Sequence, residues 1–569
     1  MSAEFQDYEL RLIETEVAVG YFAAIPADEP GVEAALDRLR ARPMDTFLRR
    51  HLLGQIRNWS LEELTRRVEE TPVEDKTVRS LFAEAVRLSE AFRPLRDRFD
   101  PAALAEETPL LYLRAETTPG RSVHRGWIDR FRANIEDHRA LPLRTEVPLA
   151  EPVSSQAMAE ARREPVALEA LREELHATFP PPSPRRPAEE TAHWALERLV
   201  SAKIQLGAEM RHEGSLSPIA LLRSWQLDRT VDCGRHQFRL HGRQTAYGRG
   251  LDLEPARAAY RMEIAERVSA FAGVADGGII GYGRDIPLRR ARYSELKSEG
   301  TAALNPNDLA LETDFPDLPL HWMTAERVTD SGREPILVPA QCVFLFSNLD
   351  EADLFEGLGS TGLAAGNTPE EAKASALLEA VERHCAATTP FATDTVFHLV
   401  ARESRLYRLL AGYRHAEIRV QFQDLTPRMG IPCCKCFVTT GVGDVVSATG
   451  ANLDAKRALL SALTEVPYPF PNGGPSGPGT VRGVIVRFED LPDYGTGSAA
   501  GDLQLLETLL RRNGISPIYV DLTREDLEIP VVRAILPGLE VTGDFGPLSR
   551  VHPRLFAKYL DAQGNGEAR

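Results

Sequence analysis

Carboxylate side chains are concentrated in one short segment, residues 368–383, which also carries the start signals of an α-helix. Thr368 can cap the helix, Pro369 suits its first turn, and Glu371 can return a hydrogen bond to the cap. At about 100° per residue, four polar side chains fall within a wedge about 80° wide, with apolar residues on the opposite face. The residues in the wedge are Glu371, Ser375, Glu379 and Glu382.

A wedge of this composition predicts a site for a metal ion and phosphate. Neighbouring like charges repel, so a merely solvated face would more often mix charges of both signs. Hard cations such as Mg²⁺ take oxygen ligands and share them with phosphate groups. Arg383 borders the wedge, and its planar guanidinium matches the geometry of phosphate oxygens.

The same Glu-x-x-Glu-Arg pattern occurs a second time, at residues 263–267, late on a helix expected from residue 255. One copy alone is more often part of an ordinary surface helix. Two copies, together with the wedge, favour a pair of helices that face each other around a shared group of cations.

The bulk properties indicate a large acidic protein of ordinary composition. The chain has 569 residues, a net charge of −16 and 43% hydrophobic residues, and this length predicts roughly two to four domains. So acidic a surface disfavours non-specific binding to nucleic acid or anionic lipid. No apolar run approaches the ~20 residues that span a bilayer, and no secretory signal is visible at the N-terminus. We therefore expect a soluble, cytoplasmic protein with no nucleic-acid or membrane partner.

The pattern along the chain changes after a proline-rich segment at residues 180–187. Residues 1–178 read mainly as helix and suggest a scaffold or a domain that binds a partner or peptide. Residues 179–213 read as a proline-rich linker followed by a helix. From 214 to 569, short β-like runs alternate with helices, which predicts an α+β fold with a mixed α/β domain. The repeated glutamate motif suggests an internal pseudo-duplication of that domain.

Several short motifs, in order along residues 214–565, resemble those of the YcaO-domain family. Residues 248–269 are similar to its first signature, a glycine-rich entry and a helix ending in Glu-x-x-Glu-Arg, and residues 360–385 are similar to its second. The further matching words are Leu320-His321-Trp322, Val338-Pro339-Ala340, Gly430-Ile431-Pro432 and the run from Pro530 to Gly538.

The resemblance implies an ATP-binding domain that holds several Mg²⁺ ions. The cation ligands it implies are Glu263, Glu266, Glu379 and Glu382. The nucleotide contacts it adds are Asn367, Glu371, Ser375, Arg383 and, on a third helix, Glu465. This chain departs from the family pattern at Ala259, Ala364 and Ser461, and the departures leave a non-catalytic adaptor open as an alternative.

By the same resemblance, the activity is ATP-dependent phosphorylation of a backbone amide oxygen in a peptide or protein, giving a thioamide or an azoline. The sequence ends without the proline-rich tail common in azoline-forming members, which favours a thioamide slightly. The implied partners are a TfuA-like or ubiquitin-activating-like protein, and a homodimer is expected by analogy. A small-molecule amide is a further alternative substrate.

Three closely spaced cysteines, Cys433, Cys434 and Cys436, form the other local cluster. Thiols could carry sulfur or bind a soft metal. However, the segment reads as a strand and lacks a second cluster of metal-binding residues, so core packing is the favoured interpretation.

Overall fold

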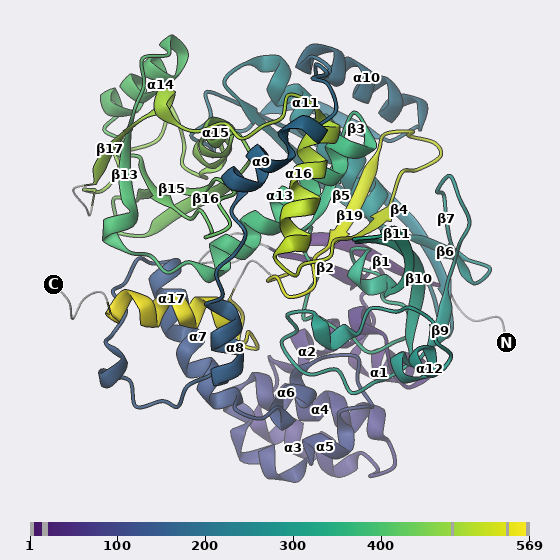
Figure 1. The fold of residues 1–569 in the computed structure, drawn as a ribbon. Helices are drawn as coiled ribbons and strands as arrows, with labels where there is room; N and C mark the ends of the chain where they lie inside the picture. The colour runs from purple at the N-terminus through teal and green to yellow at the C-terminus, as the bar shows by residue number, and fades with distance from the viewer. Residues whose placement is uncertain (1–4, 14–20, 480–482, 542–544, 565–569) are drawn as a thin grey trace.

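The computed structural model describes residues 5–13, 21–479, 483–541 and 545–564, and Figure 1 shows the course of the chain. The last five residues, 565–569, fall outside the described part, and with them the tail on which the preference for a thioamide was partly based. Within the described residues, no helix has both the length and the apolar character needed to cross a membrane.

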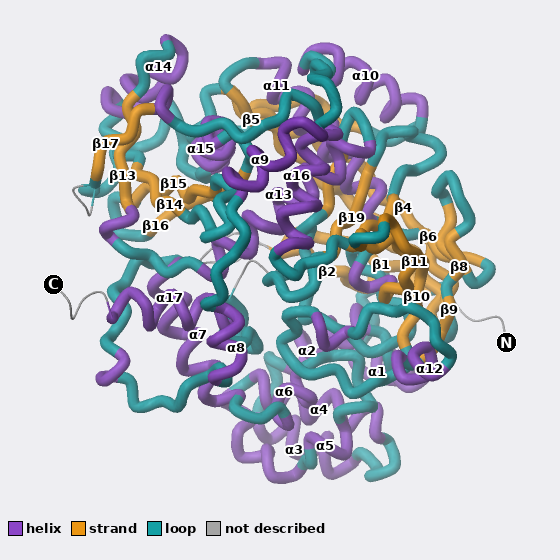
Figure 2. The backbone as a smooth tube through the Cα atoms, in the orientation of Figure 1, coloured by secondary structure: helices purple, strands orange, loops and turns teal. Residues whose placement is uncertain are grey.

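Helices and strands are mixed throughout, as the α+β prediction requires, and the described strands form three sheets (Figure 2). The first sheet has the order β2-β1-β5-β4-β6-β7-β8, with β3 paired to β4. Its strands are β1 (Gln6–Ile13), β2 (Tyr21–Pro26), β3 (Leu206–Arg211), β4 (Ile219–Cys233), β5 (His236–Gly250), β6 (Gly273–Ala275), β7 (Gly278–Ile280) and β8 (Ile286–Pro287).

The other two sheets come from the second half of the chain. One has the order β11-β10-β18-β19-β12, with β9 paired to β10, and the other has the order β16-β15-β14-β13-β17. The strands of the former are β9 (Arg289–Ala291), β10 (Leu320–Thr329), β11 (Gly332–Pro339), β12 (Leu363–Ala365), β18 (Ile518–Asp521) and β19 (Val531–Ile535). Those of the latter are β13 (Val396–Val400), β14 (Gln421–Asp424), β15 (Cys433–Thr439), β16 (Val445–Ala451) and β17 (Val484–Arg487).

Helices α11, α13 and α15 lie between the sheets, with α16 beside α13 (Figure 1). Thr368 caps α13, since its side chain accepts a hydrogen bond from Glu371 N at 3.3 Å, as the sequence predicts. The helices of the second half are α11 (Leu253–Ala270), α12 (Tyr293–Ser298), α13 (Pro369–Thr388), α14 (Ser404–His415), α15 (Ala455–Glu465), α16 (Ala499–Arg512) and α17 (Pro553–Gly564).

The N-terminal region is mostly helical, but the sequence reading needs two amendments. Residues 6–26 form β1 and β2, which join the first sheet through β5. The helix expected within residues 179–213 ends at Ser201, because Lys203 takes a left-handed φ of 57° and the chain turns into β3. The helices here are α1 (Val32–Ala41), α2 (Thr46–Ile56), α3 (Leu61–Glu70), α4 (Lys76–Leu88), α5 (Pro101–Leu104), α6 (Tyr112–Thr117), α7 (Arg121–Ile135), α8 (Ser155–Ala161), α9 (Leu168–Leu175) and α10 (Ala188–Ser201).

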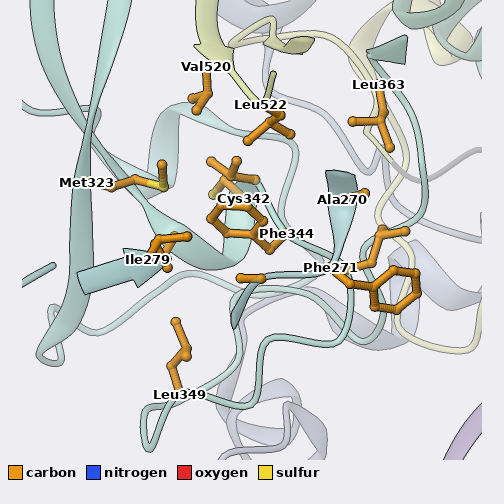
Figure 3. Close-up of a cluster of buried hydrophobic side chains, with 14 of the residues drawn as sticks. Ala270, Phe271, Ile279, Met323, Cys342, Phe344, Leu349, Leu363, Val520 and Leu522 are labelled. Atoms are coloured by element: carbon orange, nitrogen blue, oxygen red, sulfur yellow. The ribbon is translucent and has the colours of Figure 1, made fainter. Parts of the chain in front are cut away.

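One hydrophobic core joins the first two sheets, and Figure 3 shows its centre. Cys342 and Phe344, from the segment after β11, lie among Ile279 of the first sheet and Met323 and Val520 of the second. All five side chains are almost completely buried. The clustered cysteines 433, 434 and 436 are also buried, as the packing interpretation expects.

A repeated strand–helix contact supports the predicted internal duplication. A Cβ atom at Gly248 of β5 would lie 1.9 Å from the carbonyl oxygen of Ala256 on α11. A Cβ atom at Gly450 of β16 would lie 2.2 Å from that of Ala458 on α15. In both units the contact joins residues eight positions apart, so each glycine allows a helix to pack closely against the strand that precedes it.

Candidate functional site

Helix α11 presents the first pair of glutamates. Glu263 accepts a hydrogen bond from the backbone N–H of Tyr247 at 2.7 Å, which ties the helix to the end of β5. Arg267 lies between the two carboxylates, 3.7 Å from Glu263 and 3.5 Å from Glu266. All three side chains are partly buried, so one arginine balances two carboxylates in a poorly solvated place.

Helix α13 presents the second pair, and strand β16 fixes one of them. Glu382 accepts hydrogen bonds from the Thr449 hydroxyl at 2.7 Å and from the Ala451 backbone N–H at 3.1 Å. Glu379 lies one turn earlier on the same helix. Arg383, the next residue after Glu382, is exposed.

The two pairs act on each other electrostatically. Burial raises the pKa of Glu266 to about 8, with the charges of Glu379 and Glu263 adding to the effect against the opposing charge of Arg267. Burial likewise raises the pKa of Glu379 to about 7, against the charges of Arg383 and Arg267. Carboxylates raise one another's pKa only at close range, so α11 and α13 bring their glutamates together as the sequence predicts.

Glu465 joins the same group from α15. It stands as many residues after Gly450 as Glu263 stands after Gly248, so the two glutamates occupy equivalent places in the duplicated units. Its carboxylate accepts a hydrogen bond from Ser461 at 3.2 Å. Part of the side chain reaches solvent, yet burial of the carboxylate and the charge of Glu382 raise its pKa to about 7.

The remaining predicted residues lie at the other end of α13. Asn367 donates to Glu371 through both its backbone N–H and its side-chain amide, each at 2.9 Å, and accepts from Thr191 at 3.0 Å. These bonds make Glu371 part of the helix cap, about 12 Å along the axis from Glu379. Ser375 is exposed between the two ends.

Two arginines in the site were not among the predicted residues. The side chain of Arg533 on β19 is fully buried, donates to the carbonyl oxygen of Gly359 at 3.0 Å and lies close enough to Glu379 to feel its charge. Arg249 of β5 acts on both Glu263 and Glu465, and its buried Nε has no hydrogen-bond partner among the described residues. The one feature of the sequence that could have pointed to Arg249 and Arg533 is that both lie within segments that resemble YcaO motifs.

The donor set fits Mg²⁺ and phosphate. Every candidate ligand is a carboxylate oxygen, the kind of donor that Mg²⁺ prefers, and arginines stand on several sides of the group. The raised pKa values of Glu263, Glu266, Glu379 and Glu465 follow mainly from burial of these carboxylates. Among the described residues, however, no group of three or more acidic, histidine or cysteine side chains is arranged so that it could hold a metal ion by itself. An open carboxylate set is typical of Mg²⁺ that is held jointly with a nucleotide.

The fold and the site together define a nucleotide-binding protein whose acidic helices are carried by duplicated strand–helix units. A family model described as "YcaO cyclodehydratase", binding ATP and Mg²⁺, matches residues 247–467 and 478–540. The chain belongs to the YcaO family, and ATP and Mg²⁺ are its cofactors.

Similar proteins are known among sequences and solved structures. An uncharacterized protein of Methanothermobacter thermautotrophicus is 29% identical over 52% of this chain and 81% of its own length. An "uncharacterized protein in tfuA 3′region" of Rhizobium leguminosarum bv. trifolii is 26% identical over 38% of this chain and 53% of its own.

Two solved structures share part of the fold. One, a heterocyclase in complex with substrate and cofactor, has a TM-score of 0.49 at 20% identity and covers 65% of this chain and 56% of its own. The other, YcaO from Methanopyrus kandleri bound with AMPPCP and Mg²⁺, has a TM-score of 0.45 at 23% identity and covers 62% of this chain and 91% of its own.

Proposed function

We propose that this protein uses ATP to activate a backbone amide of a peptide or protein substrate by phosphorylating its oxygen. The observation that carries the proposal is that burial raises the pKa values of Glu266 and Glu379, which belong to different helices, and that the charge of Glu379 adds to the rise at Glu266. The residues proposed to hold Mg²⁺ are Glu263, Glu266, Glu379 and Glu382. Those proposed to contact the nucleotide are Arg249, Arg383 and Glu465, with Asn367, Glu371 and Ser375 at the far end of α13.

The reaction transfers the γ-phosphoryl group to the amide oxygen after a nucleophile has added to the carbonyl carbon. The carbon–oxygen bond then breaks, phosphate leaves, and the nucleophile stays on the carbon. Bound Mg²⁺ supplies neutralisation of the phosphate charges. The protein's own residues position and stabilise: Arg267 holds Glu263 and Glu266 together, and Arg383 can pair with a phosphate oxygen.

A thioamide is the proposed product, with external sulfide or a sulfur carrier as the nucleophile and an azoline as the alternative. Support comes from the Rhizobium relative, which is described as encoded in the 3′ region of tfuA. We therefore propose a TfuA-like protein as the partner. A ubiquitin-activating-like partner, a homodimer and a small-molecule amide substrate stay predictions.

The alternative function is a non-catalytic adaptor that presents a peptide to another enzyme. The departures at Ala259 and Ser461 favour it, because they remove polar groups expected near the phosphates. The structure gives Ser461 a different contact, with Glu465, which leaves the carboxylate group intact.

Calorimetric titration with a non-hydrolysable ATP analogue and Mg²⁺ tests the proposal. We expect the wild-type chain to bind the analogue, and Glu379→Gln to weaken binding at least about tenfold by removing a charged ligand. Glu370→Gln is the matched control, because Glu370 lies on the opposite side of the same helix from Glu379. Failure of the wild-type chain to bind the analogue would favour the adaptor instead.

A further inference from the structure

A second site lies between the N-terminal region and the rest of the chain, where helix α2, strand β2 and the segment 341–358 enclose a cavity of about 730 Å³. This volume lies within the range that binds small ligands or a short stretch of peptide. Neither pair of metal-site glutamates lines it.

The cavity follows the open edge of a sheet. β2 is the outermost strand of the first sheet, and all five residues from Tyr21 to Ile25 line the cavity. Successive side chains of a strand point to opposite faces, so a cavity that touches five residues in a row lies along the strand's edge. The backbone groups of that edge are therefore available to a ligand.

The hydrogen-bond alternation identifies the available groups. The N–H of Ala27 donates to the carbonyl of Asp7 at 2.8 Å, which makes this pair a hydrogen-bonded pair of the β1–β2 ladder. Because such pairs alternate, Phe22 and Ala24 direct their N–H and C=O groups away from β1, toward the cavity. By the same alternation Pro26 faces away from β1, so its lack of an N–H removes no hydrogen bond from the β1–β2 ladder.

The lining combines apolar walls with a basic rim. Phe47 and Phe346 pack against one another at a ring-centroid distance of 6.4 Å and line the wall, and the edge residues Tyr21 and Phe22 are 59% and 38% exposed. Exposed aromatic side chains beside the open edge of a sheet are typical of a binding surface.

The charge of the rim favours an acidic ligand. Arg57, the residue that follows α2, is exposed, and its side chain has no hydrogen bond or ion pair with any other described residue. The two acidic lining residues are already engaged: Glu356 accepts from Tyr112 at 2.9 Å, and Asp353 accepts from Thr46 at 3.1 Å. The buried Oε1 of Gln55 accepts no hydrogen bond from the part of the chain that the structure describes.

One lining residue of the cavity adjoins a residue that is hydrogen-bonded to the arginine beside the carboxylate group. Leu358 lines the cavity, and the next residue, Gly359, accepts the 3.0 Å hydrogen bond from Arg533. Arg533 in turn lies beside Glu379. A ligand held in the cavity is thus connected to the proposed ATP site through one buried arginine.

We propose that this cavity binds an extended, acidic segment of the polypeptide substrate, which adds a strand to β2. Backbone hydrogen bonds to Phe22 and Ala24 would supply affinity, the aromatic wall would take alternate side chains, and Arg57 would pair with a carboxylate. The identification of the peptide as the substrate rests on the proposed function, whereas the binding mode rests on the cavity alone.

Fluorescence anisotropy with two labelled peptides tests this site. One is a peptide of about ten residues that alternates Glu with Val, long enough to span the edge, and its twin carries Lys in place of Glu. We expect the wild-type chain to bind the Glu peptide at least about tenfold more tightly than the Lys peptide. Absence of saturable binding of the Glu peptide, or equal affinity for both peptides, would overturn the proposal.

Variants then separate backbone pairing from side-chain contact. Phe22→Pro removes an outward N–H and should weaken the Glu peptide at least about tenfold, whereas Phe22→Ala keeps that N–H and should weaken it less. Arg57→Glu should reverse the preference between the two peptides. Equal affinity of the Pro and Ala variants would contradict strand addition.

Two further measurements keep the test decisive. If Phe22→Pro does not fold, as judged by circular dichroism, a Glu peptide with methylated backbone nitrogens replaces it, and undiminished binding of that peptide to the wild type contradicts strand addition. Glu379→Gln should bind the Glu peptide normally. In the wild-type chain, peptide binding without analogue binding refutes the ATP assignment alone, and analogue binding without peptide binding refutes the peptide site alone.

Discussion

At the scale of single residues, the carboxylate of Glu382 is positioned before any cation or nucleotide arrives. Both of its oxygens accept hydrogen bonds from β16, one from the Thr449 hydroxyl and one from the Ala451 N–H. A ligand that is held in place in advance loses little freedom on binding, so part of the affinity of the site depends on a residue that does not touch the ligand.

Thr449→Val tests this positioning role. The substitution keeps the shape of the side chain but removes the 2.7 Å hydrogen bond to Glu382. Hydrogen bonds to a charged group contribute about 1.5–3 kcal/mol, so we expect the affinity for the ATP analogue with Mg²⁺ to fall roughly tenfold or more. Calorimetric titration measures the change.

Thr439→Val is the matched control, because the buried hydroxyl of Thr439 has no hydrogen-bond partner among the described residues. It should leave affinity unchanged and stability equal or higher. Equal affinities for wild type and Thr449→Val would show that the hydrogen bond does not position Glu382.

At the scale of elements, the site depends on helices that pack very closely onto strands. Gly248 and Gly450 allow α11 and α15 to lie against β5 and β16, and each helix carries a glutamate of the site. The separation of strand and helix therefore sets where Glu263 and Glu465 lie.

Gly450→Ala should disturb this packing. The new methyl group would lie 2.2 Å from the backbone oxygen of Ala458, which cannot move without moving α15. We expect a loss of about 2–3 kcal/mol in the free energy of unfolding, measured in urea, together with weaker binding of the ATP analogue because Glu465 is displaced.

Gly474→Ala offers the comparison, since a Cβ atom there meets no heavy atom within 4 Å. Its free energy of unfolding should stay within about 1 kcal/mol of wild type. A Gly450→Ala variant as stable as Gly474→Ala would show that the contact between β16 and α15 can relax.

At the scale of the whole molecule, the N-terminal region and the YcaO-type region share sheets and cores. Tyr8 and Leu10 of β1 are buried in the main core, and Leu168 and Leu171 of α9 are buried against the core beside α13. The backbone N–H of Leu168 also donates to the carbonyl of Met429 at 2.8 Å. Residues 1–178 therefore complete the fold of the rest.

A fragment of residues 188–569 should consequently be unstable. Removing β1 leaves the edge of β5 unpaired and uncovers apolar residues of two cores, which favours aggregation. We expect the fragment to be insoluble or to melt well below the full chain in calorimetry. Co-expression of residues 1–187 should restore solubility, and a soluble fragment with the melting temperature of the full chain would contradict this prediction.

The sequence predicted those parts of the site that depend on local patterns. The cap and wedge of α13 arise from residues within one helix, so the cap at Thr368 and the common face of Glu379 and Glu382 could be predicted from local spacing. Glu371 shows the limit of that reasoning, because a glutamate that completes a cap satisfies the same spacing as a ligand.

Features that depend on distant pairing could not be predicted. Arg533 reaches Glu379 only because β19 lies beside β12 and α13. Periodicity in the sequence predicts single helices and strands, but not which of them lie side by side. Strands β1 and β2 pair with each other locally, but the parallel pairing of β1 with β5, which joins them to the first sheet, depends on residues far along the chain. The cavity along β2 depends on this same pairing.

The pairing of β1 with β5 also bears on how the protein is made. Gln6 leaves the ribosome early, yet its partner Phe238 follows only after more than two hundred further residues. At about 5–20 residues per second, the first strand waits for at least ten seconds with its apolar side chains uncovered. The nascent chain thus passes through a long interval in which the edge of β1 can pair with a wrong strand, and a chaperone that shields the first twenty-six residues would be needed most during that interval.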